Sequence, residues 1–344
     1  MTFIEKIFDL LKRHPKRIVF PEGDDPVVMK AAEEFARMKL GAPILLGNRD
    51  LIRQHAEENG LTLNHVRLID PTTSTELPAF TERMKKIARY QSMNDEEVEK
   101  LIINPNYFAA MMVQYSNADG FVGGNTITTG ALLRPLMALI KPLPHMKTLS
   151  SCMIFETQNK QIGDHGVLYL ADCGIIPEPT VDELADIGLE TANLARQMSG
   201  LVPRVAYLAF STKGSAKHKM TEKMAAAAAL CKQKAEAIAF KIEVDGELQV
   251  DTAIDWEAGQ EKAPDSTVAG QANVLIFPDL NAGNIASKLL KSVSGANAYG
   301  HMILGLDRPA ADISRGSTWE DVLGLAALVG LRAVEYHKLY EDLY

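Results

Sequence analysis

The sequence has few cysteines, no excess of positive charge and no long apolar run, and each shortage excludes a class of protein. Its 344 residues include 3 cysteines, an odd number without the C-x-x-C spacing of zinc or redox sites. These residues, Cys152, Cys173 and Cys231, indicate reduced thiols and a cytoplasmic protein, not a disulfide framework. The net charge of -8 argues against a nucleic-acid-binding protein, because such a surface is broadly basic.

Other missing features are those of membrane, nucleotide and metal sites. No apolar run is long enough to cross a bilayer, and the N-terminal segment MTFIEKIFDLLKRHPKR alternates charged with apolar residues instead of forming a signal-peptide core. The chain also lacks a Walker A loop, a G-x-G-x-x-G fingerprint and the paired histidines or carboxylate triad of a metal site. We therefore expect no membrane, nucleic-acid or metal partner.

Short apolar runs alternate with longer helical patterns along the chain. The runs, each expected to be a buried strand, are RIVF (17–20), PILLG (43–47), DGFVGG (119–124), VLYLADC (167–173), RVAYLAFS (204–211) and NVLIFPD (273–279). They end in Gly, Pro, Asp or Ser and lead towards helical patterns such as VVMKAAEEFARMKL (27–40). This alternation predicts an α/β fold whose mainly parallel sheets are covered by helices on both faces.

The length of the chain suits two domains. KPLPHMK (141–147) has two prolines in four residues, and SVSGANAYGHM (292–302) is rich in Gly and Ser, so both are candidate crossings between domains. We expect residues 1–145 together with 301–344 to form one α/β domain and residues 146–300 to form a second, inserted one. A cleft between two such domains is the default ligand site.

The stretch DISRGSTWEDV (312–322) has two interpretations. Thr318 and Asp321 fit the T-x-x-D pattern that caps a helix, and on this stretch alone a plain cap is favoured. The same helix start would also bind an anion, because its N–H groups are unpaired and Arg315 adds a cation beside the Ser314 hydroxyl. Asp321 is then a candidate base.

Three further loops carry polar residues beyond expected strands. GGNTITTGALLRP (123–135) offers backbone N–H groups and hydroxyls to an anion, with Arg134 in the following helix, although an ordinary β-α turn fits as well. FSTKGSAKHK (210–219) is dense in hydroxyls and lysines and is otherwise a solvated loop. FPDLNAGN (277–284) is otherwise a tight turn with an Asx cap.

Taken together, these segments resemble the phosphate acetyltransferase (phosphotransacetylase) family over nearly the whole chain. The segments that carry the resemblance include RIVFPEGDD, NPNYFAAMMVQ, PRVAYLAFSTKGSA, KAPDSTVAGQANVLIFPDLNAGNIASKL and GLDRPAADISRGSTWEDV. The resemblance implies two α/β domains around a cleft, usually in a homodimer. It also implies reversible transfer of an acetyl group between coenzyme A and inorganic phosphate through acetyl phosphate, with coenzyme A as a substrate and no cofactor.

The resemblance also assigns roles to residues. Asp321 resembles the base that takes the thiol proton of coenzyme A, and Ser314 and Arg315 resemble the pair that stabilises the transition state. Residues expected to contact substrate are Arg134, Arg89, Thr128, Thr129, Ser211, Thr212, Lys213 and Asn281. The chain departs from the family pattern at three places. Pro26 and Val27 stand where the family often has an arginine soon after the EG-x-D motif. Gly123 replaces a serine, and Asn125-Thr126 replaces a small residue and a variable one.

Three rival functions stay open at the level of sequence. One is a related acyltransferase that prefers a longer chain such as butyryl, because the size of the acyl pocket is not readable from these residues. Another is a non-catalytic module that binds acetyl-CoA, although Ser314, Arg315 and Asp321 are all present. A third is a dehydrogenase of small acids on a similar fold, which the missing dinucleotide fingerprint disfavours.

Overall fold

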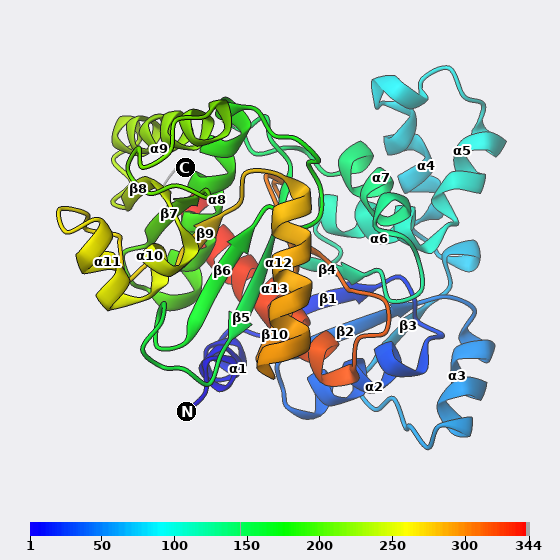
Figure 1. Cartoon of the computed structure of the whole chain (residues 1–344). Coiled ribbons are helices and arrows are strands. Elements are labelled where there is room, and N and C mark those ends of the chain that lie inside the picture. The colour runs from blue at the N-terminus through cyan, green and yellow to red at the C-terminus, as the bar shows by residue number, and fades with distance from the viewer. Residues whose placement is uncertain (145, 342–344) are drawn as a thin grey trace. The chain divides into compact units, whose positions relative to one another are not determined.

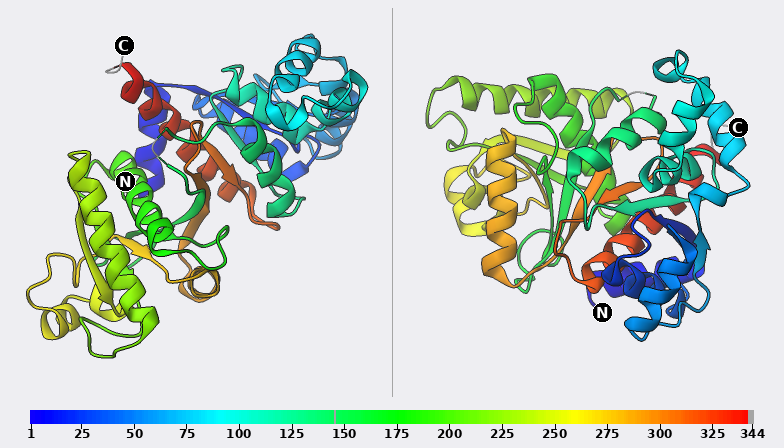
Figure 2. Two further views of the ribbon diagram at one scale, coloured as in Figure 1. Left: turned by 90° about the horizontal axis from the view of Figure 1, so that it is seen from above. Right: turned by 90° about the vertical axis from the view of Figure 1, so that its right-hand side faces the viewer.

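The computed structural model describes residues 1–144 and 146–341, and the chain divides into two compact units (Figure 1). Unit 1 comprises Met1–Pro142 and Leu306–Tyr344, and unit 2 comprises Leu143–Gly305. The domain boundary expected at residue 145 lies outside the described residues. Within each unit, helices lie on both sides of the strands (Figure 2).

Unit 1 contains a parallel sheet with the strand order β3-β2-β1-β4-β11. Its strands are β1 (Lys16–Phe20), β2 (Gly41–Leu46), β3 (Arg67–Ile69), β4 (Gly120–Gly123) and β11 (Ala310–Asp312). Every residue of β4 and β11 is buried, as parallel strands with helices on both faces require. The side chains Ile18, Val19 and Phe20 of β1 are completely buried, which explains the apolar run RIVF.

Two groups of helices cover this sheet. The helices of unit 1 are α1 (Phe3–Arg13), α2 (Pro26–Arg37), α3 (Arg49–Glu58), α4 (Leu77–Lys85), α5 (Asp95–Ile102), α6 (Pro105–Gln114), α7 (Thr129–Leu139) and α13 (Trp319–Glu341), with 3-10 turns η1 (Pro71–Thr73) and η2 (Ala88–Tyr90). Helix α13 packs with α1 and α2 and contacts β1, β4 and β11, whereas α6 packs with α7 and contacts β1 and β4. A Cβ on Gly120 would lie 2.3 Å from Cγ1 of Val329, so glycine lets α13 approach β4 closely.

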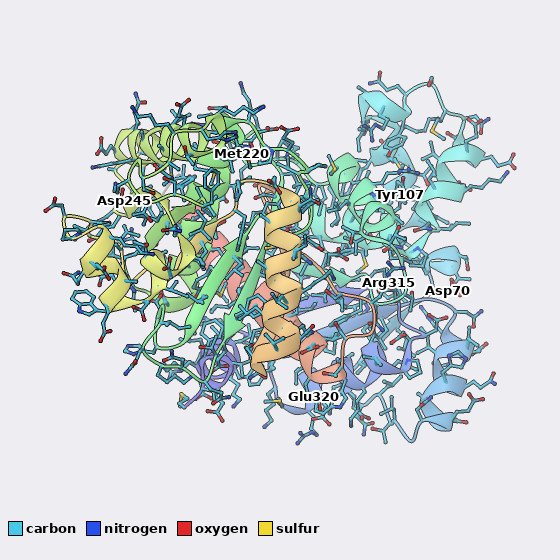
Figure 3. All side chains as sticks on the ribbon, viewed as in Figure 1. Asp70, Tyr107, Met220, Asp245, Arg315 and Glu320 are labelled. Carbon is cyan, nitrogen blue, oxygen red and sulfur yellow. The ribbon has the colours of Figure 1, made fainter. Side chains whose placement is uncertain are left out.

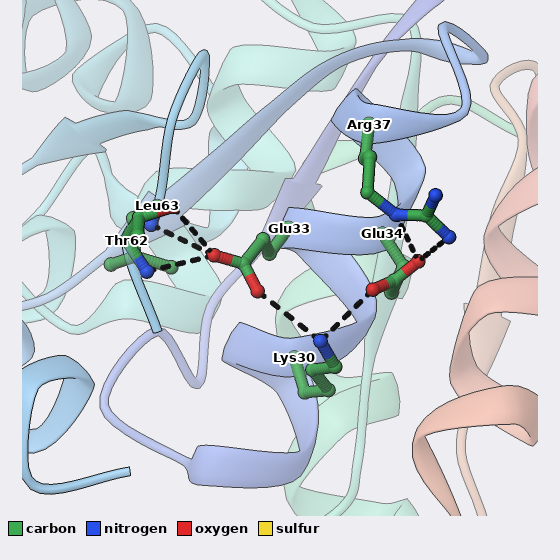
Figure 4. A network of polar contacts seen from close by, with 6 residues as sticks. All are labelled: Lys30, Glu33, Glu34, Arg37, Thr62 and Leu63. Carbon is green, nitrogen blue, oxygen red and sulfur yellow. Dashed lines mark hydrogen bonds and ion pairs between the residues drawn. The ribbon is translucent and has the colours of Figure 1, made fainter. Parts of the chain in front are cut away.

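Helix α2 follows β1 and also anchors a neighbouring loop (Figure 4). Its Glu33 carboxylate accepts hydrogen bonds from the N–H groups of Thr62 at 2.8 Å and Leu63 at 3.2 Å. Lys30 bridges Glu33 and Glu34, at 3.3 and 2.9 Å. The network fixes the loop before β3, where Leu63 has a φ of 51°.

Unit 2 contains a mixed sheet with the strand order β10-β5-β6-β9-β7-β8. Its strands are β5 (Ser150–Glu156), β6 (Val167–Ala171), β7 (Arg204–Leu208), β8 (Glu243–Leu248), β9 (Val274–Ile276) and β10 (Asn297–Leu304). Strands β6, β9, β7 and β8 pair in parallel, and β5 runs antiparallel to both of its neighbours.

The helices of unit 2 pack on this sheet through small and apolar side chains. They are α8 (Val181–Ser199), α9 (Lys219–Ala237), α10 (Val250–Ile254), α11 (Trp256–Lys262) and α12 (Leu280–Ser294). Helices α8 and α9 pack on each other, and the Tyr207 hydroxyl of β7 donates a hydrogen bond to the Leu184 carbonyl of α8 at 2.9 Å. Ala282, Ala286 and Leu290 of α12 pack against a separate core cluster of buried residues.

The α/β class with mainly parallel strands, expected from the sequence, is confirmed. The candidate crossing 292–302 contains the end of α12 at Ser294, Gly295 with a φ of 63°, and the start of β10 at Asn297. The Gly and Ser residues that suggested a crossing instead end the helix and start a buried strand. The chain returns to unit 1 after Gly305.

Candidate active site

The carboxyl ends of β1, β4 and β11 lie side by side, because β4 pairs in parallel with both other strands. In such sheets, ligands bind in the loops beyond these ends. Three polar segments begin here: the turn 21–25 after β1, the loop 124–128 after β4, and the segment 313–318 after β11. This edge of unit 1 is the candidate active site.

A carboxylate of the chain itself binds the N–H groups of the loop after β4. Glu22, 7% exposed, accepts hydrogen bonds from the N–H groups of Gly124 (2.7 Å), Asn125 (2.9 Å) and Thr126 (2.7 Å) and from the Thr126 hydroxyl (2.6 Å). The sequence-based hypothesis that these N–H groups bind a substrate anion is therefore wrong for these three donors. Their anion is internal, and it fixes the loop between β4 and α7.

The first turn of α7 connects this loop to β11. The Thr128 hydroxyl caps α7 by accepting from the N–H of Ala131 at 3.3 Å. The Thr129 hydroxyl donates to Oδ2 of Asp312 at 2.7 Å. A Cβ on Gly124 would lie 2.1 Å from Oδ1 of Asp312, and Gly124 has a φ of 113°, so only glycine fits beside this carboxyl.

Asp312 is the second buried acid of this edge, beside Glu22, and no sequence motif had indicated a role for it. It is 2% exposed at the end of β11. The pKa of its carboxyl is raised to about 6, mainly by burial and also by the nearby charge of Glu22, against the Thr129 hydroxyl and the Arg315 charge, which lower it. An acid that ends a buried parallel strand is the signal that could have identified it.

The segment after β11 confirms the helix cap. The Thr318 hydroxyl accepts from the N–H of Asp321 at 3.3 Å, and the Asp321 carboxylate accepts from the N–H of Thr318 at 3.4 Å. Ser314 lies in the turn before the cap, where its carbonyl accepts from the N–H of Ser317 at 3.1 Å. The structure therefore fixes Asp321, which is partly buried, at the first turn of α13.

Arg315 lies on the segment that leads into α13 (Figure 3) and is exposed. Within residues 1–144 and 146–341, no hydrogen bond or ion pair ties its guanidinium to another side chain, although its charge acts on the pKa of Asp312. Ser314, Arg315 and Asp321 thus lie on the segment that follows Asp312, the residue to which Thr129 donates its hydrogen bond.

The two other candidate arginines of unit 1 are also exposed. Arg134 lies on α7, between the buried residues Leu133 and Pro135. Arg89 lies in η2 beside Tyr90, where burial raises the pKa of the Tyr90 hydroxyl and the Arg89 guanidinium opposes that shift. Neither arginine has an acidic partner in the part of the chain that the structure describes.

The remaining candidates belong to unit 2, where two of them support a loop. Ser211 is buried and donates to the Glu247 carboxylate at 2.9 Å, and the buried Thr212 hydroxyl accepts from the N–H of Gln249 at 3.0 Å. Lys213 is exposed and paired with Asp245. Asn281 is exposed in the first turn of α12.

Unit 2 also contains a hydrogen-bonded cluster that sequence reasoning missed, because its residues are far apart in the chain. The Asp172 carboxylate accepts the hydroxyl of Ser151 at 2.6 Å, and the Ser151 oxygen lies 3.3 Å from Nδ1 of His301. The pKa of His301 is lowered to about 4, mainly by burial and also by the Lys288 charge, although the charge of Asp172 opposes the shift. Ser151 is completely buried, so this cluster is not a nucleophilic triad.

The cysteines take no part in these sites. All three are free and buried, and burial raises the pKa of the Cys173 thiol far above its ordinary value and that of Cys231 to about 11. Within the described residues, no group of three His, Cys, Asp or Glu side chains could bind a metal ion. None of the helices that these residues form has the length and apolar character that a membrane span requires.

Known proteins resemble this chain over nearly its whole length. The family model described as phosphate acetyl/butaryl transferase matches residues 2–329. The phosphate acetyltransferase of Thermoanaerobacterium thermosaccharolyticum is 39% identical over 333 residues, 97% of this chain and 100% of that protein. The phosphate acetyltransferase of Bacillus subtilis is 38% identical over 322 residues, 92% of this chain and 95% of that protein.

Solved structures give the same result. The EutD phosphotransacetylase from Staphylococcus aureus superposes with a TM-score of 0.86 at 34% identity, covering 96% of this chain and 99% of that one. A phosphotransacetylase from Streptococcus pyogenes gives a TM-score of 0.86 at 33% identity, with the same coverage of 96% and 99%. The chain therefore belongs to the phosphate acetyl/butaryl transferase family.

Proposed function

We propose that this chain is a phosphate acetyltransferase, which transfers an acetyl group reversibly between coenzyme A and inorganic phosphate. The observation that carries the proposal is the likeness to curated phosphate acetyltransferases over nearly the full length, with 39% identity across 97% of this chain. Ser314, Arg315 and Asp321 lie on one segment at the carboxyl ends of parallel strands, which supports the proposal.

Asp321 acts as the base in the direction that forms the thioester. The thiol of coenzyme A, with an ordinary pKa near 8.5, is mostly protonated at neutral pH and needs a base. Asp321 takes the proton, the sulfur attacks the carbonyl carbon of acetyl phosphate, and the bond from that carbon to the phosphate oxygen breaks. The proton then passes from Asp321 to the departing phosphate, so atoms and charge balance.

Cationic and hydroxyl groups stabilise the charge that develops in this reaction. Negative charge grows on the carbonyl oxygen and on the phosphate, and we assign its stabilisation to Arg315 and Ser314, which lie on the segment that leads to the base. We assign substrate contacts in unit 1 to Arg134, Arg89, Thr128 and Thr129, and in unit 2 to Lys213 and Asn281. Ser211 and Thr212 stabilise the loop that carries Lys213 instead of contacting substrate, because their hydroxyls are buried and already hydrogen-bonded.

We also propose that the two units are the two domains of the enzyme and that it works in the cytoplasm as a homodimer. The free thiols support a reducing compartment. Ile285, Leu289 and Val293 of α12 support the dimer, because they are 64%, 59% and 72% exposed and lie four residues apart on one helix face. A stripe of this kind can pack against its own copy around a two-fold axis.

The first experiment follows thioester formation from coenzyme A by ultraviolet absorbance, with acetyl, propionyl and butyryl phosphate in parallel. We expect acetyl phosphate to give the highest kcat/KM. A preference for butyryl phosphate would contradict the acetyl assignment. A folded protein that binds acetyl-CoA but turns over none of the three would be a binding module instead.

The same assay tests the base. We expect Asp321→Asn to lower kcat at least about a hundredfold with little change in KM, because general-base catalysis contributes on that order. Glu320→Gln is the matched control, since Glu320 is an exposed acid in the same helical turn. Equal kcat values for Asp321→Asn and the unmodified enzyme would remove Asp321 from this role.

A further inference from the structure

A small cavity lies beside β3, the edge strand of the unit 1 sheet (Figure 1). Its volume is about 130 Å³, room for roughly four water molecules at their volume in the liquid. The strand order β3-β2-β1-β4-β11 puts three strands between β3 and β11, so these two are roughly 19 Å apart at the usual spacing of about 4.8 Å. None of the residues that line the cavity belongs to the candidate active site.

The apolar part of the cavity lining, here called the floor, consists of Ile69 on β3 and of Phe108 and Met112 on α6, all of them buried. Phe80 of α4 packs edge-on against Phe108, with the two ring centroids 5.1 Å apart, so α4 and α6 hold this floor in place. Water gains little from such a surface. A hydrocarbon chain that covers the floor is stabilised by the hydrophobic effect.

Two arginines line the same cavity. Arg49 is the first residue of α3, and Arg67 is the first residue of β3. In the part of the chain that the structure describes, neither guanidinium has a hydrogen bond, an ion pair or a ring contact. Arg53, one turn further along α3, is instead paired with Asp50 at 3.4 Å. The charges of Arg49 and Arg67 are therefore available to an anion, and a guanidinium binds a carboxylate through two parallel hydrogen bonds.

The turn that leads into α4 adds uncharged donors. Thr73, Ser74 and Thr75 line the cavity and carry hydroxyls. The backbone N–H groups of Ser74 and Thr75 have no hydrogen-bond acceptor among the described residues. Asp70, labelled in Figure 3, fixes the turn by accepting from the N–H of Thr72 at 2.9 Å and from its hydroxyl at 2.6 Å. Hydroxyl and N–H groups of this kind bind carboxylate oxygens without adding charge to the site.

The charged residues of the lining select the charge of the ligand. Glu76 is the acid among the lining residues, and Asn117 is uncharged. One carboxylate beside two guanidiniums leaves one positive charge in excess at neutral pH. A monoanion balances that excess, whereas a dianion such as phosphate exceeds it and is repelled by Glu76.

We propose that this cavity binds a short-chain monocarboxylate, with the carboxylate on Arg49 and Arg67 and the hydrocarbon chain on the floor. The volume suits a carboxylate of a few carbons, because it is well below the roughly 300–1,000 Å³ of sites for larger ligands. The site does not depend on the proposed function, since it shares no residue with the candidate active site.

The test follows butyrate binding through the methyl signal of Met112 in nuclear magnetic resonance. The methionines carry isotope-labelled methyl groups, Met112→Leu assigns the signal, and butyrate replaces chloride at constant ionic strength. We expect the Met112 signal to shift and to saturate as butyrate is added. A signal that does not respond to butyrate would overturn the proposal, and the cavity would hold water alone.

Variants of the two arginines locate the carboxylate. Arg67→Gln and Arg49→Gln should each weaken butyrate binding about tenfold, because a hydrogen bond between charged groups is lost. Arg53→Gln is the matched control, since Arg53 is an exposed arginine of α3 that does not line the cavity, and it should bind butyrate like the unmodified protein. The other methionine signals show whether each variant folds. Equal affinity in the unmodified protein and in both cavity variants would refute the assignment to these arginines.

The class of anion is tested with acetate, octanoate and inorganic phosphate in the same titration. Butyrate should bind more tightly than acetate, which covers less of the floor, and more tightly than octanoate, which is too long for the cavity. It should also bind more tightly than phosphate, and Glu76→Gln should reduce that preference by removing the repelling charge. Phosphate that shifts the Met112 signal at the same concentrations as butyrate would contradict the choice of a monocarboxylate.

Discussion

At the scale of single residues, His301 shows how neighbours select one form of a side chain. The Ser151 hydroxyl has one hydrogen, and its 2.6 Å bond to the Asp172 carboxylate uses it. The contact of 3.3 Å between Ser151 and Nδ1 of His301 is a hydrogen bond only if Nδ1 carries the proton. The imidazole is therefore neutral with Nε2 unprotonated, the form that burial favours.

His301 should make stability depend on pH in the acid range. Its pKa in the folded protein, about 4, lies below the ordinary value of 6.5, so the unfolded chain binds the proton first. Stability is then lost as pH falls from about 6.5 to about 4, by at most roughly 3 kcal/mol at about 1.4 kcal/mol per pKa unit. Urea unfolding of His301→Asn across this range should show a smaller loss than the unmodified protein.

A matched variant isolates this effect. His14 is an exposed histidine at the end of α1, and His14→Gln should keep the acid dependence of the unmodified protein. Parallel pH curves for His301→Asn and His14→Gln would refute the assignment to His301.

At the scale of elements, the loop between β4 and α7 depends on a residue far away in the chain. Glu22 lies 102 residues before Gly124, yet its carboxylate binds successive N–H groups of that loop. The loop starts from Gly123, where a Cβ would lie 2.7 Å from Cγ of Pro21. Glycine at this position therefore allows β4 to end directly against the turn after β1.

Glu22→Gln should destabilise the protein by about 2–3 kcal/mol. A glutamine side chain has only one oxygen, so its NH₂ group would face a backbone N–H group that now donates to the carboxylate. That N–H group would lose its hydrogen bond, and a buried donor without an acceptor costs free energy of folding. Thermal unfolding measures the loss. Glu33→Gln is the comparison, because Glu33 also binds backbone N–H groups but is partly exposed (Figure 4). An equal or larger loss for Glu33→Gln would contradict the argument.

At the scale of the whole molecule, both units use parallel strands with helices on both sides, but unit 2 reverses one strand. Strand β5 is buried over its full length and runs antiparallel to β10 and β6. On α12, Ala282, Ala286 and Leu290 pack against the core of unit 2, and the neighbouring stripe of the same helix leaves Ile285, Leu289 and Val293 exposed. Exposed apolar stripes of this kind mark interaction surfaces.

Leu289→Lys should convert the proposed dimer to a monomer, because it places a charge in the middle of the stripe. Light scattering coupled to size-exclusion chromatography measures the mass. Ile238→Lys is the control, since Ile238 is 61% exposed at the end of α9 and lies outside the stripe. A Leu289→Lys protein that keeps the mass of a dimer would exclude this face as the interface.

The sequence by itself determined the elements whose signals are local. The apolar runs at β1, β2, β4, β6, β7 and β9 predicted buried strands, and T-x-x-D predicted the cap that Thr318 and Asp321 form. Such patterns can be recognised in the sequence because the residues that form one strand or one helix cap are only a few positions apart in the chain. The family assignment follows from long ordered segments and is confirmed by near full-length matches.

Only the tertiary structure decided which polar groups meet. The bond from Thr129 to Asp312 joins residues 183 apart, and the contact of Ser151 with His301 joins residues 150 apart. The N–H groups of the loop after β4 are suited to a substrate anion by their sequence, but in the structure the Glu22 carboxylate accepts their hydrogen bonds. Periodicity reports which way a side chain faces within its own element, whereas these contacts depend on strand order and register, which no local pattern encodes.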